Sequence, residues 1–254
     1  MSSKTTLYIY VLGFFALQAC NRLPYTSVQQ GGLQQLDSNW TETHQKIDAL
    51  IQPYKNQIGS QMNVVIGYSA FEMIKARPES ALGNGVCDML MQYGLSEIDE
   101  SLDLCIMNHG GLRAPIPKGA VTIGRIFELM PFDNTLVIVE LDSTELNALA
   151  SHILVKGGEP IAGVTHTSIV NYKSGACFMA GEQAFTNNKT YKILTSNYLA
   201  DGGDGYNVFV GKPRTETNIL IRQALLEGFS NTTETAPFSS QVDGRIIWDP
   251  NLDE

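Results

Sequence analysis

Two short apolar runs constrain the fold more strongly than any other feature of this sequence. One is LDLCIMN at residues 102–108, and the other is TLVIVEL at residues 135–141. Runs of this length and composition are typical of strands buried inside a sheet. The second run is followed at once by DSTELNALASHIL, in which Asp142 and Glu145 have the spacing of a capping box at the start of a helix. The pattern therefore predicts a sheet that is covered by helices.

The remaining segments fit the same architecture. Further strands are predicted at residues 62–70, 163–172, 190–198 and 244–248. Further helices are predicted from about Ser38 through Ile51, at 80–94 with Gly94 as the C-terminal stop, and at 215–229. Strands and helices alternate irregularly, without an internal repeat or linker. We therefore expect one α+β domain over residues 38–249, with a mixed β-sheet covered by helices.

The N-terminus has the pattern of a bacterial lipoprotein leader. Residues 1–19 combine Lys4 with a short apolar run, and the end of this segment resembles a lipobox with cleavage before Cys20. Lipid on Cys20 would anchor an exported protein to a bacterial membrane, on the periplasmic side or at the cell surface. The polar residues 20–37 would then form a tether. A short membrane anchor that is never cleaved is the alternative.

Charge and ligand spacing exclude several classes of protein. The formal net charge of −9 argues against binding nucleic acid through clustered Lys and Arg side chains. The four histidines, His44, His109, His152 and His166, form no D-x-H, H-x-H or H-E-x-x-H pattern. His152 falls in a predicted helix and His166 in a predicted strand, which favours structural roles for both, and His44 is expected at the rim of a helix face. Three cysteines beyond Cys20 show no C-x-x-C spacing, and their odd number leaves at least one free thiol: Cys87, Cys105 and Cys177. We therefore expect no cofactor and no catalytic metal site in this chain.

Turn-rich segments carry the candidate binding residues. In NHGGLR, glycines such as Gly111 let the backbone approach a ligand, Asn108 offers a donor and an acceptor, and Arg113 can hold a phosphate. In TSNYLADGGDGYNVF, at 195–209, three glycines surround acidic residues and aromatic residues flank them, as in a pocket wall. Phe132 stands beside another turn, in ELMPFDN. The alternatives are a plain surface loop, an exposed arginine and an aromatic side chain that folds back into the core.

These segments together carry a resemblance to a known family. NHGGLR, LMPFDNTLVIVEL and TSNYLADGGDGY, in this order and at these separations, resemble the C-terminal substrate-binding domain of the 5′-nucleotidases. That family includes periplasmic UDP-sugar hydrolases and the animal ecto-5′-nucleotidase. ESALGNGVCDML, at 79–90, resembles the helix that opens the same domain. The likeness covers residues 38–249 and implies the α+β fold of that domain and binding of a nucleotide or nucleoside.

The resemblance also implies roles for individual residues. The base would be sandwiched between the rings of Phe132 and Tyr198, because these positions match the two stacking aromatics of the family. Asn108 would contact the base, and Arg113 would meet phosphate. Asp204 would bind the pair of ribose hydroxyls, and the glycines around it would let the turn point its carboxylate into the cleft.

Two features depart from the family pattern. Arg77, in KARPES, is the only counterpart of the family's arginine before the opening helix. The family's N-terminal metallophosphatase domain, which holds two divalent metal ions, has no counterpart here. We therefore expect a substrate-binding subunit, inactive by itself, that presents nucleotide to a separate metallophosphatase chain in nucleotide catabolism. The alternative is a stand-alone nucleotide- or nucleoside-binding lipoprotein without catalysis.

Overall fold

The computed structural model describes residues 45–98, 100–163, 167–172, 175–180, 183–185 and 189–247. The chain divides into two compact units, Met1–Leu50 and Ile51–Glu254. The predicted leader, Cys20, the tether and the start of the N-terminal helix lie outside the described residues, as do His44 and His166. All contacts discussed below belong to the second unit.

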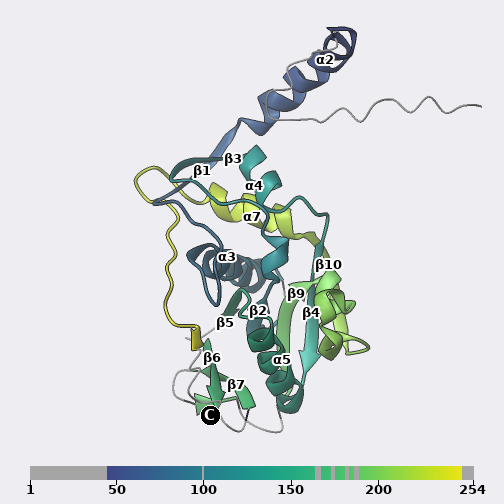
Figure 1. Cartoon of the computed structure of the whole chain (residues 1–254), viewed down its shortest axis with the longest axis vertical. Helices are drawn as coiled ribbons and strands as arrows, with labels where there is room; N and C mark the ends of the chain where they lie inside the picture. Colours follow the sequence, from purple (N-terminus) through teal and green to yellow (C-terminus); the bar gives the residue numbers. More distant parts are fainter. Residues whose placement is uncertain are drawn as a thin grey trace, which may run out of the picture. The chain divides into compact units, whose positions relative to one another are not determined.

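Helices and strands alternate along the described chain (Figure 1). The helices are α2 (Gln45–Met62), α3 (Ala81–Glu97), α4 (Ile123–Leu129), α5 (Ser143–Val155), α6 (Asn197–Ala200) and α7 (Ile221–Ser230). The strands are β1 (Val65–Ser69), β2 (Leu104–Ile106), β3 (Gly119–Thr122), β4 (Thr135–Leu141), β5 (Ile161–Gly163), β6 (Thr167–Tyr172), β7 (Gly175–Ala180), β8 (Gln183–Ala184), β9 (Tyr191–Ser196), β10 (Arg214–Leu220) and β11 (Ile246–Ile247). Short 3-10 turns lie at His109–Gly111, Gly203–Gly205 and Asn207–Phe209. None of the helices described is at once long and apolar enough to cross a membrane.

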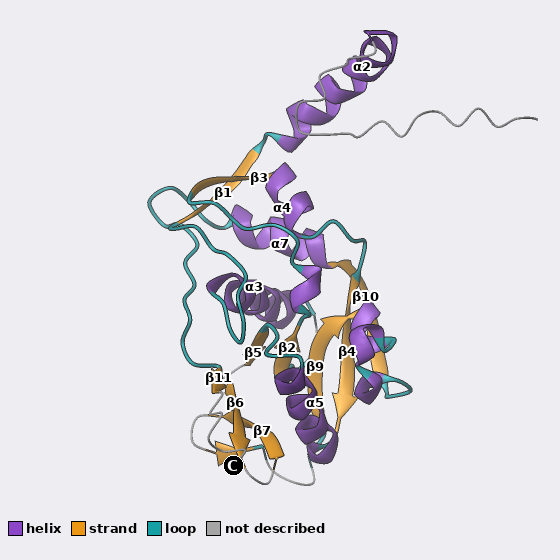
Figure 2. Cartoon of the chain, in the orientation of Figure 1, coloured by secondary structure: helices purple, strands orange, loops and turns teal. Residues whose placement is uncertain are grey.

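The described strands form three sheets (Figure 2). The largest has the order β10-β4-β9-β2-β5, and the smaller ones have the orders β1-β3 and β11-β6-β7-β8. In the largest sheet, β2 runs parallel to β9, whereas the other neighbouring strands are antiparallel. This mixed sheet with its covering helices confirms the predicted α+β fold.

Alternation along the central strands supplies side chains to both faces of the large sheet. In β4, Leu136 and Ile138 belong to one buried cluster, whereas Val137 and Val139 belong to another. Successive strand residues point to opposite faces, so one strand serves two cores. The first cluster includes residues of α3 and α7, and the second includes residues of α5. Both faces of the sheet are therefore covered, which explains why TLVIVEL is apolar along its whole length.

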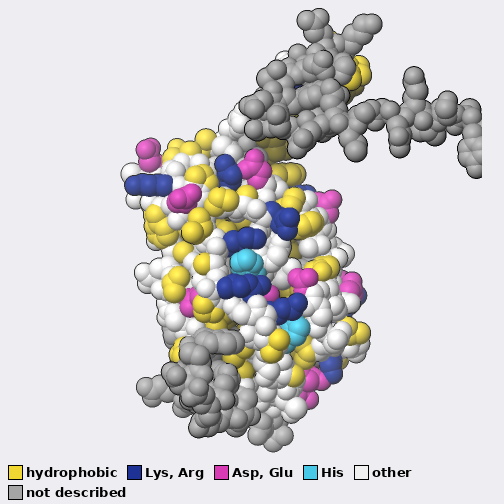
Figure 3. All heavy atoms as spheres, in the orientation of Figure 1, with side chains coloured by type: hydrophobic (Ala, Val, Ile, Leu, Met, Phe, Trp, Pro, Cys, Tyr) yellow, Lys and Arg dark blue, Asp and Glu magenta, His cyan; other side chains and the backbone are white. Residues whose placement is uncertain are grey.

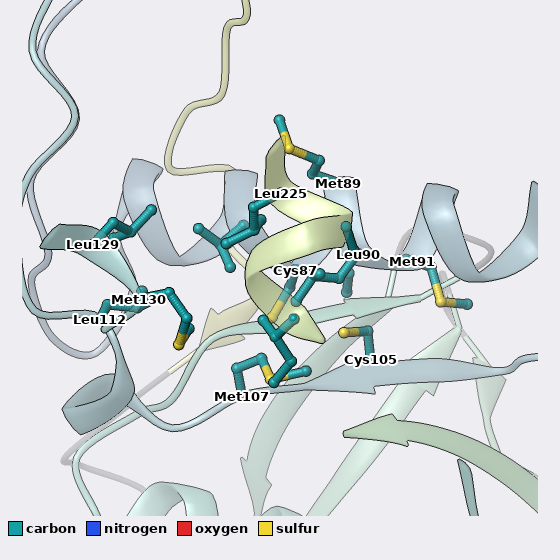
Figure 4. Packing of buried hydrophobic residues seen from close by; sticks show 14 of the residues in the cluster. Cys87, Met89, Leu90, Met91, Cys105, Met107, Leu112, Leu129, Met130 and Leu225 are labelled. Carbon is teal, nitrogen blue, oxygen red and sulfur yellow. The ribbon is translucent and has the colours of Figure 1, made fainter. Parts of the chain in front are cut away.

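The first cluster shows how closely helices and sheet approach. Cys87 and Leu90 of α3 and Leu225 of α7 lie over Cys105 of β2 (Figure 4). Burial raises the pKa of the Cys87 thiol well above its usual value, and a hydrogen bond with the thiol of Cys105 raises it further. Both thiols are completely buried and belong to the packed interior.

Gly94 is not the C-terminal stop of α3, which corrects the prediction. The helix begins after its N-cap Ser80 and continues to Glu97. Gly94 is buried within it, and a Cβ atom there would lie 2.6 Å from Leu102 Cδ1 and 3.0 Å from Leu194 Cδ2. The glycine therefore permits close packing of the helix on the sheet.

The predicted helix at 215–229 is wrong in its first half. Residues Arg214–Leu220 form β10, which pairs with β4, and only Ile221–Ser230 are helical. β-branched residues such as Thr217 favour a strand, and the Thr217 hydroxyl donates a hydrogen bond to the Leu136 carbonyl at 2.7 Å. The free edge of β4 thus decided the conformation of a segment whose apolar spacing also suits a helix.

Candidate functional site

Three segments that are distant in the sequence meet at one end of the strands of the large sheet. They follow β2, precede β4 and follow β9. β2 and β9 are parallel, so both finish at this end of the sheet. β4 is antiparallel to β9, so it starts there. The segments enclose a cleft of about 350 Å³ lined by Asn108, Gly110, Gly111, Arg113, Phe132, Asn134, Tyr198 and Asp204.

The two aromatic rings at the cleft are not core residues. Phe132 and Tyr198 are each 42% exposed, although large apolar rings are usually buried in a domain of this size. The alternative of a loop aromatic that folds back into the core therefore does not apply to Phe132. Both rings are available to a planar ligand, and their stacking on a base stays a prediction.

Asp204 is held by two side chains from different segments. Tyr198 Oη donates a hydrogen bond to Asp204 Oδ1 at 2.9 Å, and Asn108 Nδ2 donates to Asp204 Oδ2 at 2.7 Å. The backbone N–H of Asp204 also donates to Tyr198 Oη at 3.2 Å. The bond to Asp204 raises the pKa of the Tyr198 hydroxyl, with a smaller contribution from burial. The carboxylate is thus fixed at the cleft before any ligand binds.

The glycines around Asp204 have distinct steric roles. Gly202 and Gly205 adopt φ values of +89° and +80°, and Asp204 itself has a φ of +53°. Such backbone angles favour glycine and are tolerated by Asp. A Cβ atom on Gly203 would lie 2.5 Å from Tyr198 Cζ, so this glycine lets the ring lie against the turn. This tight turn places the Asp204 carboxylate beside the ring.

The NHGGLR segment lines the cleft beside this turn. A Cβ atom on Gly111 would lie 2.7 Å from Asn108 Oδ1, so the glycine leaves room for the Asn108 side chain. Arg113 is exposed, and its Nη1 donates a hydrogen bond to the Gly110 carbonyl at 3.3 Å. Its backbone N–H donates to the Leu129 carbonyl at 2.8 Å. Arg113 thus places a guanidinium at the cleft that can meet an anion.

Arg77 does not line the cleft. Its guanidinium donates hydrogen bonds to the carbonyl oxygens of Lys156 and Gly158, and its Nη2 lies 3.4 Å from Glu159 Oε1. Five of the predicted ligand-binding side chains, together with Gly111, share one cleft, and Arg77 stands apart from them. Its contact with a ligand stays a prediction.

Sequence analysis missed residues that shape the site from other elements. Asn134 lines the cleft directly. Arg222 of α7 donates hydrogen bonds to the Met130 carbonyl at 3.2 Å and the Phe132 carbonyl at 3.3 Å. Asn197 Oδ1 accepts a hydrogen bond from the Thr135 backbone N–H at 3.1 Å, which ties the start of β4 to the segment after β9. No local signal could have found Arg222, because it lies 90 residues from Phe132 in the chain.

Neither of the two described histidines, His109 and His152, lines the cleft. His152 lies on α5, as predicted, and its ring centroid lies 4.5 Å from that of the buried Tyr206. Burial lowers the pKa of His152, and Lys156 lowers it further. Burial also lowers the pKa of His109, and the positive charges of Arg77 and Lys75 lower it further. Across the described ranges, no group of three or more His, Cys, Asp or Glu side chains is arranged to hold a metal ion.

One face of the molecule carries a group of basic side chains despite the acidic composition (Figure 3). Figure 3 shows Lys, Arg and His side chains gathered near the centre of one face. The chain as a whole has a net charge of −9, so this group of basic side chains differs in sign from the average of the molecule. It favours an anionic ligand on that face.

Comparison with known sequences gives a consistent family. The family described as "5'-nucleotidase, C-terminal domain" matches residues 65–211. The trifunctional nucleotide phosphoesterase protein YfkN of Bacillus subtilis is 28% identical over 188 residues, covering 66% of this chain and 13% of that protein. The 5'-nucleotidase of Diplobatis ommata is 27% identical over 154 residues, covering 51% of this chain and 27% of that protein. The matched part is thus a small share of these relatives.

Comparison with solved structures supports the fold. The 5'-nucleotidase precursor from Thermus thermophilus matches with a TM-score of 0.62 at 23% identity, covering 78% of this chain and 42% of that one. A putative 5'-nucleotidase from Staphylococcus aureus matches with a TM-score of 0.62 at 16% identity, covering 83% and 45%. At these identities the likeness concerns the fold alone.

Proposed function

Because the chain belongs to the family of 5′-nucleotidase C-terminal domains, we propose that it binds a nucleotide in the cleft lined by Phe132, Tyr198 and Asp204. The observation that carries this proposal is the convergence of three distant segments on one cleft with two exposed aromatic rings. A planar base needs apolar faces on which to stack, and a ribose needs a fixed acceptor for its hydroxyls.

Each part of the nucleotide has a chemically suitable partner. The rings of Phe132 and Tyr198 would take the base, with Asn108 at its polar edge. Asp204, already oriented by two hydrogen bonds, would accept hydrogen bonds from both ribose hydroxyls. Arg113 would hold the phosphate, since a guanidinium matches a pair of phosphate oxygens.

We further propose that phosphate release occurs on a separate metallophosphatase chain, to which this subunit presents its nucleotide in nucleotide catabolism. The described residues place no cluster of side chains suited to a metal ion. In two-metal hydrolases the ions activate the attacking oxygen and stabilise the leaving one. The divalent metals would therefore belong to the partner, and the residues described here would bind and orient the substrate.

Calorimetric titration with adenosine, AMP and 2′,3′-dideoxyadenosine tests the binding proposal. We expect the parent protein to bind adenosine and AMP. Arg113→Ala should weaken AMP binding by about tenfold while sparing adenosine, because its partner is phosphate. Asp204→Ala should weaken adenosine binding more than dideoxyadenosine binding. A parent protein that binds neither adenosine nor AMP would contradict the proposal.

An activity assay tests the division of labour. The purified chain with added divalent metal ions should release no phosphate from AMP above background, and addition of the cognate metallophosphatase chain should restore release. Metal-dependent release by this chain alone, retained through a second purification, would show that it carries its own catalytic site. Binding of AMP without any partner that hydrolyses it would favour the stand-alone binding lipoprotein.

We also propose that the protein is exported and anchored through lipid on Cys20. The support is the leader-like sequence that ends at this cysteine. Mature protein should begin at Cys20 and partition with membranes, whereas Cys20→Ser should release it or leave an uncleaved precursor. A Cys20→Ser protein that is still processed and membrane-bound would exclude lipidation at this position.

A further inference from the structure

A buried carboxylate lies behind the cleft, where two of its supporting segments meet. Glu159 is only 5% exposed. Its Oε2 accepts a hydrogen bond from the backbone N–H of His109, and its Oε1 lies 3.4 Å from Arg77 Nη2. A carboxylate so removed from water destabilises a fold unless it is paired and hydrogen-bonded. Glu159 therefore holds both Arg77 and the NHGGLR segment.

The backbone before Glu159 is built to place this side chain. Gly157 and Gly158 adopt φ values of +80° and +99°, and a Cβ atom on Gly158 would lie 1.9 Å from the Pro78 carbonyl oxygen. Only glycine allows so close an approach. Arg77 reaches the same loop through the carbonyl oxygens of Lys156 and Gly158. Glu159 thus extends from a fixed loop, and its position does not depend on a flexible surface segment.

Hydrogen bonds lead from Glu159 to the cleft. His109 directly follows Asn108, whose Nδ2 donates to Asp204 Oδ2 at 2.7 Å. The neighbouring Met107 N–H donates to the Pro160 carbonyl at 3.0 Å. The loop that carries Glu159 therefore makes two hydrogen bonds to this segment, one at Met107 and one at His109. We propose that Glu159 is a positioning residue: its hydrogen bond with His109 fixes the Asn108 loop and thereby the Asn108–Asp204 contact. The effect on ligand binding rests on the proposed function of the cleft.

The electrostatics of Glu159 favour this role over a stabilising one. Burial raises the pKa of its carboxyl group, against the opposing effects of the His109 N–H and Arg77, and Asp204 raises it further. A raised pKa in the folded state means that the neutral form favours folding and that this contribution is lost as pH rises through the raised pKa. Ionisation of Glu159 therefore works against the stability of the fold. A carboxyl group that is kept in such a buried place, bonded to the His109 N–H, is consistent with a task at the site.

Two substitutions separate the effect of the length of the Glu159 side chain from the effect of its charge. Glu159→Asp keeps the charge but stops one methylene short of His109, whereas Glu159→Gln keeps an acceptor of the same length without the charge. Glu159→Met keeps the length, removes the strong acceptor and suits a buried position, so it tests the loss of the bond if Glu159→Asp fails to fold. Glu79→Asp is the matched control, because the Glu79 carboxylate likewise accepts from one side chain and one backbone N–H. Its Oε1 accepts from Asn84 Nδ2 at 2.6 Å and from the Asp243 N–H at 2.8 Å.

Amide hydrogen exchange on the ligand-free protein is the first readout, measured by NMR at His109 and Asp204. Glu159→Asp and Glu159→Met should exchange about tenfold faster at both amides, because the loop and the turn lose their common support. Glu159→Gln and Glu79→Asp should exchange like the parent. Adenosine binding is the second readout, and it should weaken by about tenfold in the Asp and Met variants alone.

The two readouts keep failure of this inference distinct from failure of the proposed function. Parent-like exchange at Asp204 in Glu159→Asp or in Glu159→Met would overturn the positioning role. Exchange in Glu159→Gln as fast as in Glu159→Asp would also overturn it, because charge and Arg77 would then matter in place of the bond to His109. If the parent binds no adenosine or AMP, the proposed function fails, and the exchange rates still decide whether Glu159 positions the turn.

Discussion

Phe132 and Tyr198, with the loop that carries each ring, form two aromatic rims of the cleft, and the two rims are held in different ways. On the Phe132 rim the anchor is the backbone, since Arg222 donates hydrogen bonds to the carbonyl oxygens of Met130 and Phe132, and its guanidinium lies 4.2 Å from the centre of the Phe127 ring. On the Tyr198 rim the anchor is the side chain itself, since its hydroxyl bonds to Asp204 at 2.9 Å. One rim is supported by a helix behind it, and the other by its own turn.

The difference teaches where each rim is vulnerable. Support for the Phe132 rim comes from α7, about ninety residues away in the chain, and ends at the backbone. Direct support for the Tyr198 side chain comes from within the eight residues from Tyr198 to Gly205, whereas Asn108 holds Asp204 from outside this turn. Damage to α7 should therefore weaken one stacking surface alone. Damage to the turn should disturb a stacking surface and the predicted ribose acceptor together.

Gly203→Ala should have the largest effect, because it breaks the Tyr198 rim as a unit. The new Cβ atom would lie 2.5 Å from both Tyr198 Cζ and the Tyr198 carbonyl oxygen. The ring cannot stay in place, so adenosine binding should weaken by about 100-fold or more, as measured by calorimetry. Gly110→Ala is the matched control in the same cleft, since its nearest neighbour would be Asn108 Nδ2 at 3.5 Å. Equal losses for the two variants would show that the fit of Tyr198 on Gly203 is unimportant.

Removing either ring should have the next largest effect. Phe132→Ala and Tyr198→Ala should each weaken adenosine binding roughly 5- to 150-fold, by analogy with bases stacked on aromatic side chains. Tyr198→Ala should lie nearer the upper end, because Asp204 loses a partner along with the stack. Two variants that both bind adenosine as tightly as the parent would mean that the rings do not contact the base.

Arg222→Ala should weaken adenosine binding by about tenfold through the Phe132 rim. The loop loses its donors at 3.2 Å and 3.3 Å, while the contacts of Tyr198 with Asp204 stay intact. The loss should be much smaller in a Phe132→Ala background, where the supported ring is already absent. Arg125→Ala is the control, because Arg125 pairs with Glu128 on α4 and does not line the cleft. Full additivity of the Arg222 and Phe132 substitutions would contradict this account.

Tyr198→Phe should have the smallest effect and separates stacking from orientation. The ring remains, but the bonds to Asp204 at 2.9 Å and 3.2 Å are lost. Adenosine binding should weaken by about two- to tenfold when titrated in parallel with the parent, because Asp204 is then oriented by Asn108 alone. Binding of 2′,3′-dideoxyadenosine should change less, since it lacks the hydroxyls that Asp204 would bind. Equal losses for both ligands would place the role of the hydroxyl outside the ribose contact.

Local chemistry allowed much of the fold to be predicted. TLVIVEL forms β4 over the predicted residues, and Asp142 and Glu145 form the predicted capping box. Prediction failed where a neighbour decided the outcome. Gly94 looked like a helix stop because the sheet that packs against it is invisible in the sequence. The 215–229 segment was divided between β10 and α7 because β4 offered an edge to its first half.

The cleft divides in the same way between sequence and tertiary structure. By itself the sequence determined the segments that line the cleft. The turn-forming glycines, the loop Phe132 and the NHGGLR segment can be recognised from neighbouring residues in the chain. Tertiary structure alone decided that these parts meet, since this requires β2 parallel and β4 antiparallel to β9. It also decided that Arg222 and Glu159 would support them. Local periodicity carries no information about which strand pairs with which, and pairing sets the neighbours of every side chain at the edge of the sheet.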